Sequence, residues 1–469
     1  MDLCYASART LTRLVRAGEV SAREVMAAHL DRINAVNPAI NAIVAKLDDD
    51  RCLALADEAD KRRAAGDDLG PLHGLPIAFK DLEPAVGFPQ TFGSPIFRDL
   101  RPTEDSVLVA RLRAAGVIPI GKTNVPEFGM GSHSYNSLYG TTRNPYDTTK
   151  TAGGSSGGAA AALASGMLPI ADGSDLGGSL RNPANFNNIV ALRPSVGLVP
   201  RAPLLTPLMP GFSVKGPMGR SVQDVAFVLS VMAGADARDP ASYPSEPSIF
   251  AASLERSLDG VRVAWCPNLG DLPLDKRVRV VLEQHRATIE GLGCTTEDAA
   301  PDLSDADDIF LTLRAWAAHA GYGRLLPKHR DRMKPEAVWE VERGAKLTGA
   351  DISDALAKHG RLLERLRQFQ ETYDYMVCAV NQVPPFDADI DWPKEVDGTP
   401  MDNYIGWMRS AYRVSVTMCP AASVPAGFTD DGLPVGIQLV GRRRDDLGVL
   451  QLAYAFEQAT RVGDRRPPL

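Results

Sequence analysis

The spacing of apolar residues along the chain predicts helices that alternate with strands. A capping box, Ser21–Glu24, opens the first clear helical pattern, because serine three residues before glutamate satisfies the exposed N–H groups of a helix start. Met26, Leu30 and Ile33 then recur at helical spacing. The pair Asn37-Pro38 predicts that this helix ends there, since proline disfavours a helical residue before it.

Apolar runs bounded by glycine or proline predict buried strands. The run Leu75–Lys80 has no polar position until its final lysine. Similar runs occur at Val261–Trp265, Met376–Val380, Ala422–Pro425 and Val435–Val440, with Asp431-Gly432 as a hairpin turn before the last of them. Residues 274–292 and 303–375 read as helical. Because strands and helices alternate, the sequence predicts an α/β fold, an α/β/α sandwich around a large mixed β-sheet.

Composition and charge narrow the class of protein. The 469 residues are 44% hydrophobic and 23% charged with a net charge of −7, which is typical of a soluble globular protein. No block of lysine or arginine marks a nucleic-acid footprint, and the longest apolar stretch, Val225–Ala235, is too short to span a bilayer. Six scattered cysteines predict reduced thiols in a cytoplasmic protein and no metal site.

Two glycine-rich segments are candidates for the loops of an active site. In Gly153–Gly158 four glycines surround two serines directly before the alanine-rich stretch Ala159–Ala164. A flexible linker would not be followed at once by a strong helix former, so a rigid turn at a helix N-terminus is the better interpretation. In Asp175–Arg181 two glycines precede a serine, a pattern that can aim several backbone N–H groups at one oxyanion.

These segments and the lysine strand resemble the blocks of the amidase signature family. The similar blocks, which cover about residues 1 to 460 and are weakest across 235–375, are Gly74–Asp81, Tyr139–Asp147, Thr151–Gly158, Gly173–Pro183, Leu192–Gly197 and Gly432–Gln438. Ser155 and Ser179 are 24 residues apart (179 − 155), the interval that the family uses. Two residues depart from the usual pattern, Ala159 and Asp172, and we expect neither to touch a catalytic atom.

The resemblance implies a Ser–Ser–Lys hydrolase without a cofactor. Ser179 would be the nucleophile, Ser155 the proton relay held by a cis Gly154–Ser155 peptide, and Lys80 the base. The backbone N–H groups of Leu176, Gly177, Gly178 and Ser179 would form the oxyanion hole, and Ser156, Asp175 and Arg181 would shape the loop. We also expect Gly129, Met130, Gly131 and Ser156 to contact the substrate.

The same resemblance predicts the domain organisation, the branch of the family and the partners of the protein. It implies a single domain over residues 1–469, in which the variable and largely helical region 303–410 lines the substrate site. Asn185-Phe-Asn-Asn-Ile189, Asp172 and Asn381-Gln-Val-Pro-Pro385 are most similar to the nylon-oligomer, urethane-cleaving and aryl-amidase branch. The expected partners are a neutral amide or carbamate, with no nucleic acid and no membrane, and the expected state is a monomer or homodimer.

Three other functions are possible from the residues alone. Gly116–Thr123 matches the phosphate-loop pattern GxxxxGK[ST], although its variable positions are apolar and include a proline. A Ser–His–Asp hydrolase could use His73 or His133; we expect His73 to be structural and His133 to line the pocket or lie on the surface. A binding protein with a dead site would need no catalytic residue, yet Lys80, Ser155 and Ser179 are all present.

Overall fold

The computed structural model describes residues 1–203 and 211–469 and has the predicted α/β architecture. Its strands are β1 (Ile43–Val44), β2 (Pro76–Lys80), β3 (Ile118–Thr123), β4 (Tyr135–Asn136), β5 (Gly140–Thr141), β6 (Ala171–Asp175), β7 (Val190–Arg193), β8 (Val214–Gly219), β9 (Arg262–Trp265), β10 (Thr295–Asp298), β11 (Tyr375–Ala379), β12 (Glu395–Val396), β13 (Thr399–Pro400), β14 (Ala421–Phe428) and β15 (Pro434–Val440).

Helices cover these strands along the whole chain. They are α1 (Ala8–Ala17), α2 (Ala22–Ile40), α3 (Asp49–Ala64), α4 (Val107–Ala114), α5 (Gly157–Ala164), α6 (Arg181–Phe186), α7 (Val222–Met232), α8 (Lys276–Glu283), α9 (Arg286–Gly291), α10 (Ala306–Tyr322), α11 (Leu326–His329), α12 (Pro335–Ala345), α13 (Gly349–Thr372), α14 (Arg409–Val416) and α15 (Asp446–Thr460). None of the described helices is both long and apolar enough to cross a membrane.

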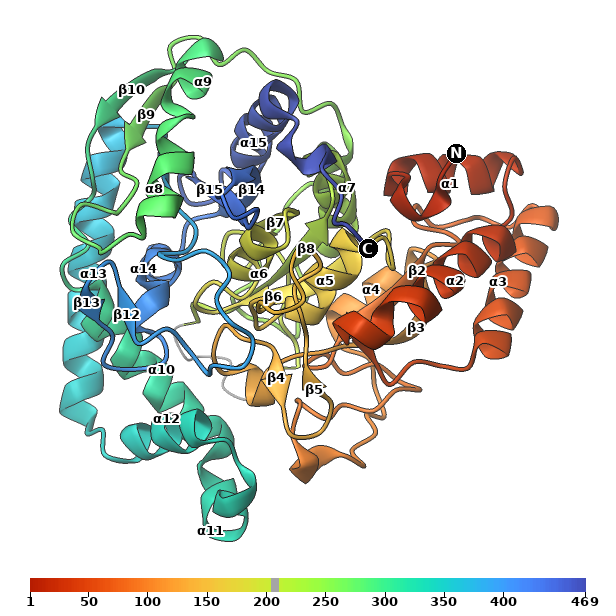
Figure 1. Ribbon diagram of the computed structural model, residues 1–469, viewed down its shortest axis with the longest axis horizontal. Coiled ribbons are helices and arrows are strands. Elements are labelled where there is room, and N and C mark those ends of the chain that lie inside the picture. The colour runs from red at the N-terminus through yellow and green to blue at the C-terminus, as the bar shows by residue number, and fades with distance from the viewer. Residues whose placement is uncertain (204–210) are drawn as a thin grey trace.

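A large mixed sheet forms the centre of the molecule. Its strand order is β10-β9-β11-β15-β14-β7-β8-β6, with β9 parallel to β11 and the β11–β15 pair antiparallel. A smaller sheet, β1-β3-β2, packs beside it where β2 lies against β6. Figure 1 shows the small sheet with α1–α3 on one side of the molecule and β9, β10 and α13 on the other. The predicted mixed-sheet fold is confirmed.

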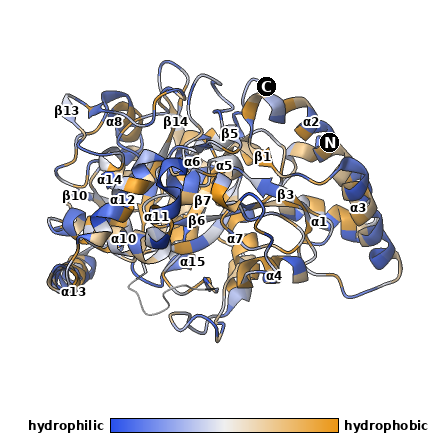
Figure 2. Cartoon of the chain, turned by 90° about the horizontal axis from the view of Figure 1, so that it is seen from below, coloured by the Kyte–Doolittle hydropathy of each residue, from blue (hydrophilic) through white to orange (hydrophobic). Residues whose placement is uncertain are grey.

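The elements nearest to the glycine-rich loops are buried on all sides. Every residue of β2 and of α5 is buried, so neither shows the alternation or the polar stripe of a surface element. The main core contains α5, β7 and α7, and a second core forms between α10, α13 and α14. In Figure 2 the central elements, among them α7, are largely apolar, whereas the outlying α11 is hydrophilic.

Two helix boundaries differ from the sequence prediction. The helix expected to end at Asn37-Pro38 continues to Ile40 with Pro38 in its last turn. It ends because Asn41 adopts a left-handed conformation with φ of 56° and donates its N–H to the carbonyl of Asn37 at 2.7 Å. The single helix expected over residues 274–292 is two helices, α8 and α9, that are separated at Gln284 and His285.

Candidate active site

Lys80 lies at the end of β2 with its side chain completely buried. Its Nζ is 2.8 Å from Ser155 Oγ, 2.7 Å from Ser156 Oγ and 2.9 Å from Ser174 Oγ. The structure therefore brings together the predicted base and the predicted relay serine, which are 75 residues apart in the sequence. Ser156 and Ser174 are additional partners of the lysine that the sequence did not reveal.

The surroundings of Lys80 favour its neutral form. Burial lowers the pKa of the ammonium to about 7, although the carboxylates of Asp172, Glu83 and Asp175 act in the opposite direction. A neutral amine has two N–H groups and one lone pair. It can donate to Ser156 and Ser174 while it accepts the proton of the Ser155 hydroxyl, which is the geometry of a general base.

The two serines are held by neighbouring backbone contacts. The Gly154–Ser155 peptide is cis, as predicted. Ser132 donates its hydroxyl to the Gly154 carbonyl at 2.6 Å, and the Ser156 N–H donates to the Ser179 carbonyl at 3.2 Å. The first contact joins the glycine-serine loop before α5 to the segment around Ser132, and the second joins it to the loop after β6. Ser155 is 2% exposed and Ser179 is 8% exposed, so both lie at the floor of the site.

The loop Leu176–Ser179 presents backbone N–H groups beside the predicted nucleophile, Ser179. Gly178 has φ of +115°, and a Cβ there would lie 2.5 Å from the Asn182 side chain, so this position requires glycine. The Gly178 N–H is already donated to Asp175 Oδ1 at 2.9 Å. Leu176, Gly177 and Ser179 donate their N–H groups to no other described residue, so they are the members of the predicted oxyanion hole that can serve a substrate.

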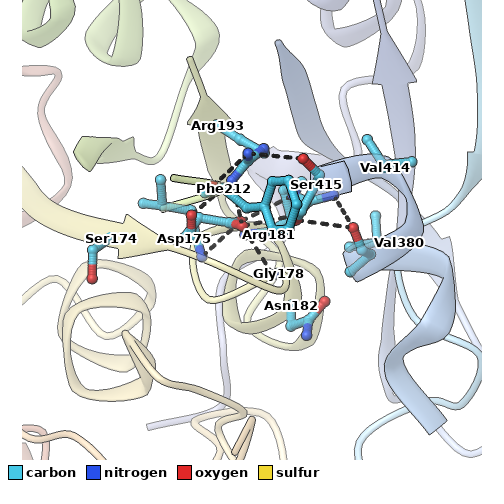
Figure 3. A network of polar contacts seen from close by, with 12 residues as sticks. Ser174, Asp175, Gly178, Arg181, Asn182, Arg193, Phe212, Val380, Val414 and Ser415 are labelled. Atoms are coloured by element: carbon cyan, nitrogen blue, oxygen red, sulfur yellow. Dashed lines mark hydrogen bonds and ion pairs between the residues drawn. The ribbon is translucent and has the colours of Figure 1, made fainter. Parts of the chain in front are cut away.

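Asp175 fixes this loop through a buried ion network (Figure 3). Its carboxylate accepts the N–H of Gly178 and of Leu180 and pairs with Arg181 at 2.9 Å and Arg193 at 3.1 Å. All three charged side chains are fully buried, and the two guanidinium groups hold the pKa of Asp175 far below its usual range, against the effect of burial. The predicted loop-shaping roles of Asp175 and Arg181 agree with this geometry.

Asp172 is closer to Lys80, the predicted base, than the sequence suggested. It lies on β6, is completely buried, and accepts the backbone N–H of Lys80 at 3.1 Å. Burial raises the pKa of its carboxyl to about 6, and the nearby Glu83 acts in the same direction. The contact is to the lysine backbone and not to its amine. The negative charge of Asp172 nevertheless acts to raise the pKa of the Lys80 amine.

The residues expected to contact the substrate fall into two groups. Gly129 has φ of +70°, and a Cβ there would lie 2.8 Å from Leu82 and 3.7 Å from Ser155 Oγ, so this glycine borders Ser155. Met130 is buried in a small apolar cluster and Gly131 lies beside Tyr404. Ser156 is completely buried against Lys80, which places it behind the reacting groups and not on the substrate side.

The structure also decides between the other chemical interpretations. His133 is buried, with Nδ1 2.7 Å from Thr151 Oγ1 and Nε2 3.0 Å from the Ala388 carbonyl, so both nitrogens are occupied and a surface position is wrong. His73 is buried against the Ala59 carbonyl, as expected of a structural histidine. Lys122 of the phosphate-loop motif is buried inside β3, and its amine binds the Glu83 carbonyl. The motif is a strand and cannot wrap a phosphate.

Activity should depend on the protonation of Lys80. Only the neutral amine can accept a proton, and a pKa of about 7 means that protonated lysine predominates below that value. We expect kcat/KM to rise across roughly pH 6 to 8 and then to level off. Removing the negative charge of Asp172 should lower the pKa of Lys80 further, so Asp172→Asn should move the rising limb toward lower pH by ~1 unit.

This shift can be measured from pH–rate profiles of both proteins on one amide. Asp430→Asn, the same substitution at an exposed aspartate, is the matched control and should leave the midpoint unchanged. Two results would contradict the assignment of Lys80 as the base. One is a value of kcat/KM that falls as the pH rises through neutrality. The other is a rising part of the profile that Asp172→Asn moves toward higher pH.

Comparison with known protein families gives one matching model. The Amidase family model matches residues 24–450. Among curated relatives, an acylamidase of Rhodococcus erythropolis is 35% identical over 99% of this chain and 98% of its own. A glutamyl-tRNA(Gln) amidotransferase component of Symbiobacterium thermophilum is 36% identical over the same shares of the two chains.

Solved structures agree with this match. A bacterial aryl acylamidase described as an amidase signature enzyme superposes with a TM-score of 0.91 at 28% identity, covering 99% of both chains. A 6-aminohexanoate cyclic dimer hydrolase in complex with its substrate superposes with a TM-score of 0.88 at 28% identity, covering 100% of this chain and 99% of its own. These neighbours include the aryl-amidase and nylon-oligomer types that the sequence motifs resemble.

Proposed function

The chain belongs to the amidase signature family and is an amide hydrolase, and from that premise we propose that it cleaves neutral amides and carbamates through a covalent Ser179 intermediate. The observation that supports this mechanism best is the contact between the buried Lys80 amine and Ser155 Oγ, with the pKa of Lys80 near neutrality. A buried lysine that can be neutral at pH 7 is what an uncharged relay to a serine nucleophile requires.

The reaction follows from this arrangement. Ser179 Oγ attacks the carbonyl carbon, its proton moves to Ser155 Oγ, and the Ser155 proton moves to Lys80 Nζ. The N–H groups of Leu176, Gly177 and Ser179 stabilise the oxyanion. When the C–N bond breaks, the proton returns from Lys80 through Ser155 to the leaving nitrogen. Water then attacks the acyl carbon, and its proton moves through Ser155 to Lys80. As the bond between the acyl carbon and Ser179 Oγ breaks, this proton returns through Ser155 to Ser179 Oγ, and the acid is released.

The charged residues beside the loop Leu176–Ser179 favour a neutral substrate. Arg181 and Arg193 are both fully buried and both pair with Asp175, so neither is available to bind a substrate carboxylate. A substrate such as glutamine carries a carboxylate and an ammonium group that would each need a partner in the site. Uncharged amides are therefore favoured over amino-acid amides such as glutamine.

Carbamate cleavage is a separate prediction. An amide and a carbamate both present a carbonyl to Ser179 and develop the same oxyanion, so we expect both an anilide and an aryl carbamate to be hydrolysed. Amine release and the intact mass of protein trapped with substrate would measure this. Ser179→Ala should show neither turnover nor a mass increase. Amine from the anilide with none from any carbamate would restrict the function to amide hydrolysis.

A further inference from the structure

The turn Glu127–Gly131 lies beside Ser155 and has an unusual backbone. Phe128, Gly129 and Gly131 are all left-handed, with φ of 55°, 70° and 93°. Glycine adopts this conformation freely, but a bulky residue such as Phe128 does so only where the surrounding structure enforces it. The contacts that hold this turn are therefore of interest for the site.

The inner side of the turn borders the glycine-serine loop. A Cβ added to Gly129 would lie 3.7 Å from Ser155 Oγ. Ser132, the residue directly after the turn, donates its hydroxyl to the Gly154 carbonyl at 2.6 Å. That carbonyl belongs to the peptide that carries Ser155. A displacement of the turn would therefore move the relay serine as well.

The outer side of the turn is bound by Lys334, the N-terminal cap residue of α12. Its backbone N–H donates to Glu127 Oε2 at 2.6 Å, and its Nζ donates to the Met130 carbonyl at 3.2 Å. The Lys334 side chain is 11% exposed, so water competes little with these contacts. One residue thus holds the turn near both of its ends.

The Lys334 amine is itself fixed by its neighbours. Nζ lies 4.3 Å from the centre of the Tyr135 ring and 3.8 Å from Glu336 Oε2, and the Tyr135 hydroxyl donates to Glu336 Oε1 at 3.0 Å. Burial lowers the pKa of Lys334, whereas the carboxylates of Glu336 and Glu127 act in the opposite direction. Both protonation states retain an N–H for the Met130 carbonyl.

Helix α10, which packs against α12, supports the turn by apolar contacts (Figure 1). Phe128 stacks on Tyr322 with ring centres 4.4 Å apart, and Met130 lies in the same apolar cluster. Nearer its start, α10 packs on the predicted oxyanion loop, since a Cβ at Gly177 would lie 2.8 Å from Phe310 Cζ. Apolar contacts have no preferred direction, so the hydrogen bonds from α12 set the orientation of the turn.

We propose that Lys334 is a positioning residue for the proton relay. By fixing the turn Glu127–Gly131, it keeps the Ser155 hydroxyl in line with its two partners in the relay. The inference rests on the proposed function. It extends the machinery of that function into the helical region 303–410, which the sequence predicted only to line the substrate site.

A misaligned relay should slow amide cleavage more than the cleavage of an activated ester. With an amide, the relay removes the Ser179 proton and also returns it to the leaving nitrogen, which is too basic to depart without it. A p-nitrophenolate group departs as a stable anion and needs only the first transfer. The ratio of amide to ester turnover therefore reports on the alignment of the relay, whereas a loss of folded protein lowers both rates equally.

Lys334→Met tests the proposal, because it removes the amine and keeps most of the length of the side chain. The substrates are p-nitroacetanilide and p-nitrophenyl acetate, which share the acetyl group. We expect kcat to fall about 30-fold or more on the anilide and about threefold or less on the ester, with each KM changed less than about twofold.

Two further variants control this result. Lys334→Arg retains an N–H donor and should restore the anilide-to-ester ratio to within about threefold of the unchanged enzyme. Lys346→Met removes an exposed lysine from the other end of α12 and should change neither rate. Lys334→Gln keeps a polar group beside Glu336 but is too short to reach Met130. It should lower the ratio as Lys334→Met does, and it decides the question if Lys334→Met does not fold.

The contrary outcomes are distinct. A Lys334→Met enzyme with an unchanged anilide-to-ester ratio overturns the inference, whether both rates are retained or both fall together with Tm. A raised KM on both substrates at unchanged kcat would mean that Lys334 serves substrate binding, and this also overturns it. Failure of the proposed function would show differently, because the unchanged enzyme would release no p-nitroaniline or Ser179→Ala would retain turnover.

Discussion

Replacing Lys80 by methionine is expected to lower kcat/KM on a neutral amide by about 10³-fold or more, and Ser179→Ala to abolish covalent turnover. The reason is that Ser179 needs a base and the Lys80 amine, in contact with Ser155 Oγ, is the base that the structure offers. Ser155→Ala should cost about as much as Lys80→Met, because removing either interrupts one relay. The double variant should be little worse than either single one.

Lys122→Met is the matched control for this prediction. Lys122 is also completely buried and lies on the neighbouring strand, paired through the register Phe79–Lys122, but its amine binds the Glu83 carbonyl and no catalytic serine. Both methionine variants lose a buried amine, and Tm measurements would show how much each loses in stability. If Lys80→Met kept most of its activity, or if Lys122→Met lost as much at equal Tm, the relay would be wrong.

Removing the carboxylate of Asp175 is expected to have the largest effect on stability. Asp175→Ala would leave the guanidinium groups of Arg181 and Arg193 buried without their anion, a change that costs about 3 to 5 kcal/mol of unfolding free energy. It would also free the N–H groups of Gly178 and Leu180 and loosen the oxyanion loop. Denaturant unfolding and kcat should both be affected.

The control is an ion pair of the same kind at the surface. Glu371 pairs with Arg367 across one helical turn of α13, and both side chains are more than half exposed. Glu371→Ala should cost less than about 0.5 kcal/mol and leave kcat unchanged. A stability loss for Asp175→Ala as small as that of the control would contradict the importance of the buried network.

The parts of the site that lie in short, unusual motifs could be predicted from the sequence. Ser155 and Ser179 each lie among glycines that no strand or helix interior would retain, and Lys80 ends a run that is otherwise apolar. The structure places Lys80 and Ser155 in contact and joins the two glycine-rich loops through Ser156 and Ser179. The fold class was predictable for a related reason, since buried strands between helices have a clear pattern.

Residues whose role depends on strand packing could not be found in this way. Asp172 and Ser174 are two residues apart on β6 and therefore share one face of the strand. Only the position of β6 beside β2 brings Ser174 to the amine of Lys80 and Asp172 to its backbone. Nothing local in the sequence specifies that Lys80 and Asp172, 92 residues apart, lie on adjoining strands. The helix end at Asn41 was missed for a different reason, because proline is tolerated in the last helical turn when an asparagine closes it.

Helix α10 supports the predicted oxyanion loop at one end and lines a cleft at the other, so the two can be altered independently. Phe310, in its second turn, packs on the loop Leu176–Ser179, whereas Ala317 and Tyr322 line a cleft of about 690 Å³ two to three turns later. A library confined to positions 317 to 325 would therefore vary the shape of that cleft, while Lys80, Ser155 and Ser179 stay on a strand and loops of the buried core. Natural substitutions on this part of α10 need no compensating change at Lys80, Ser155 or Ser179.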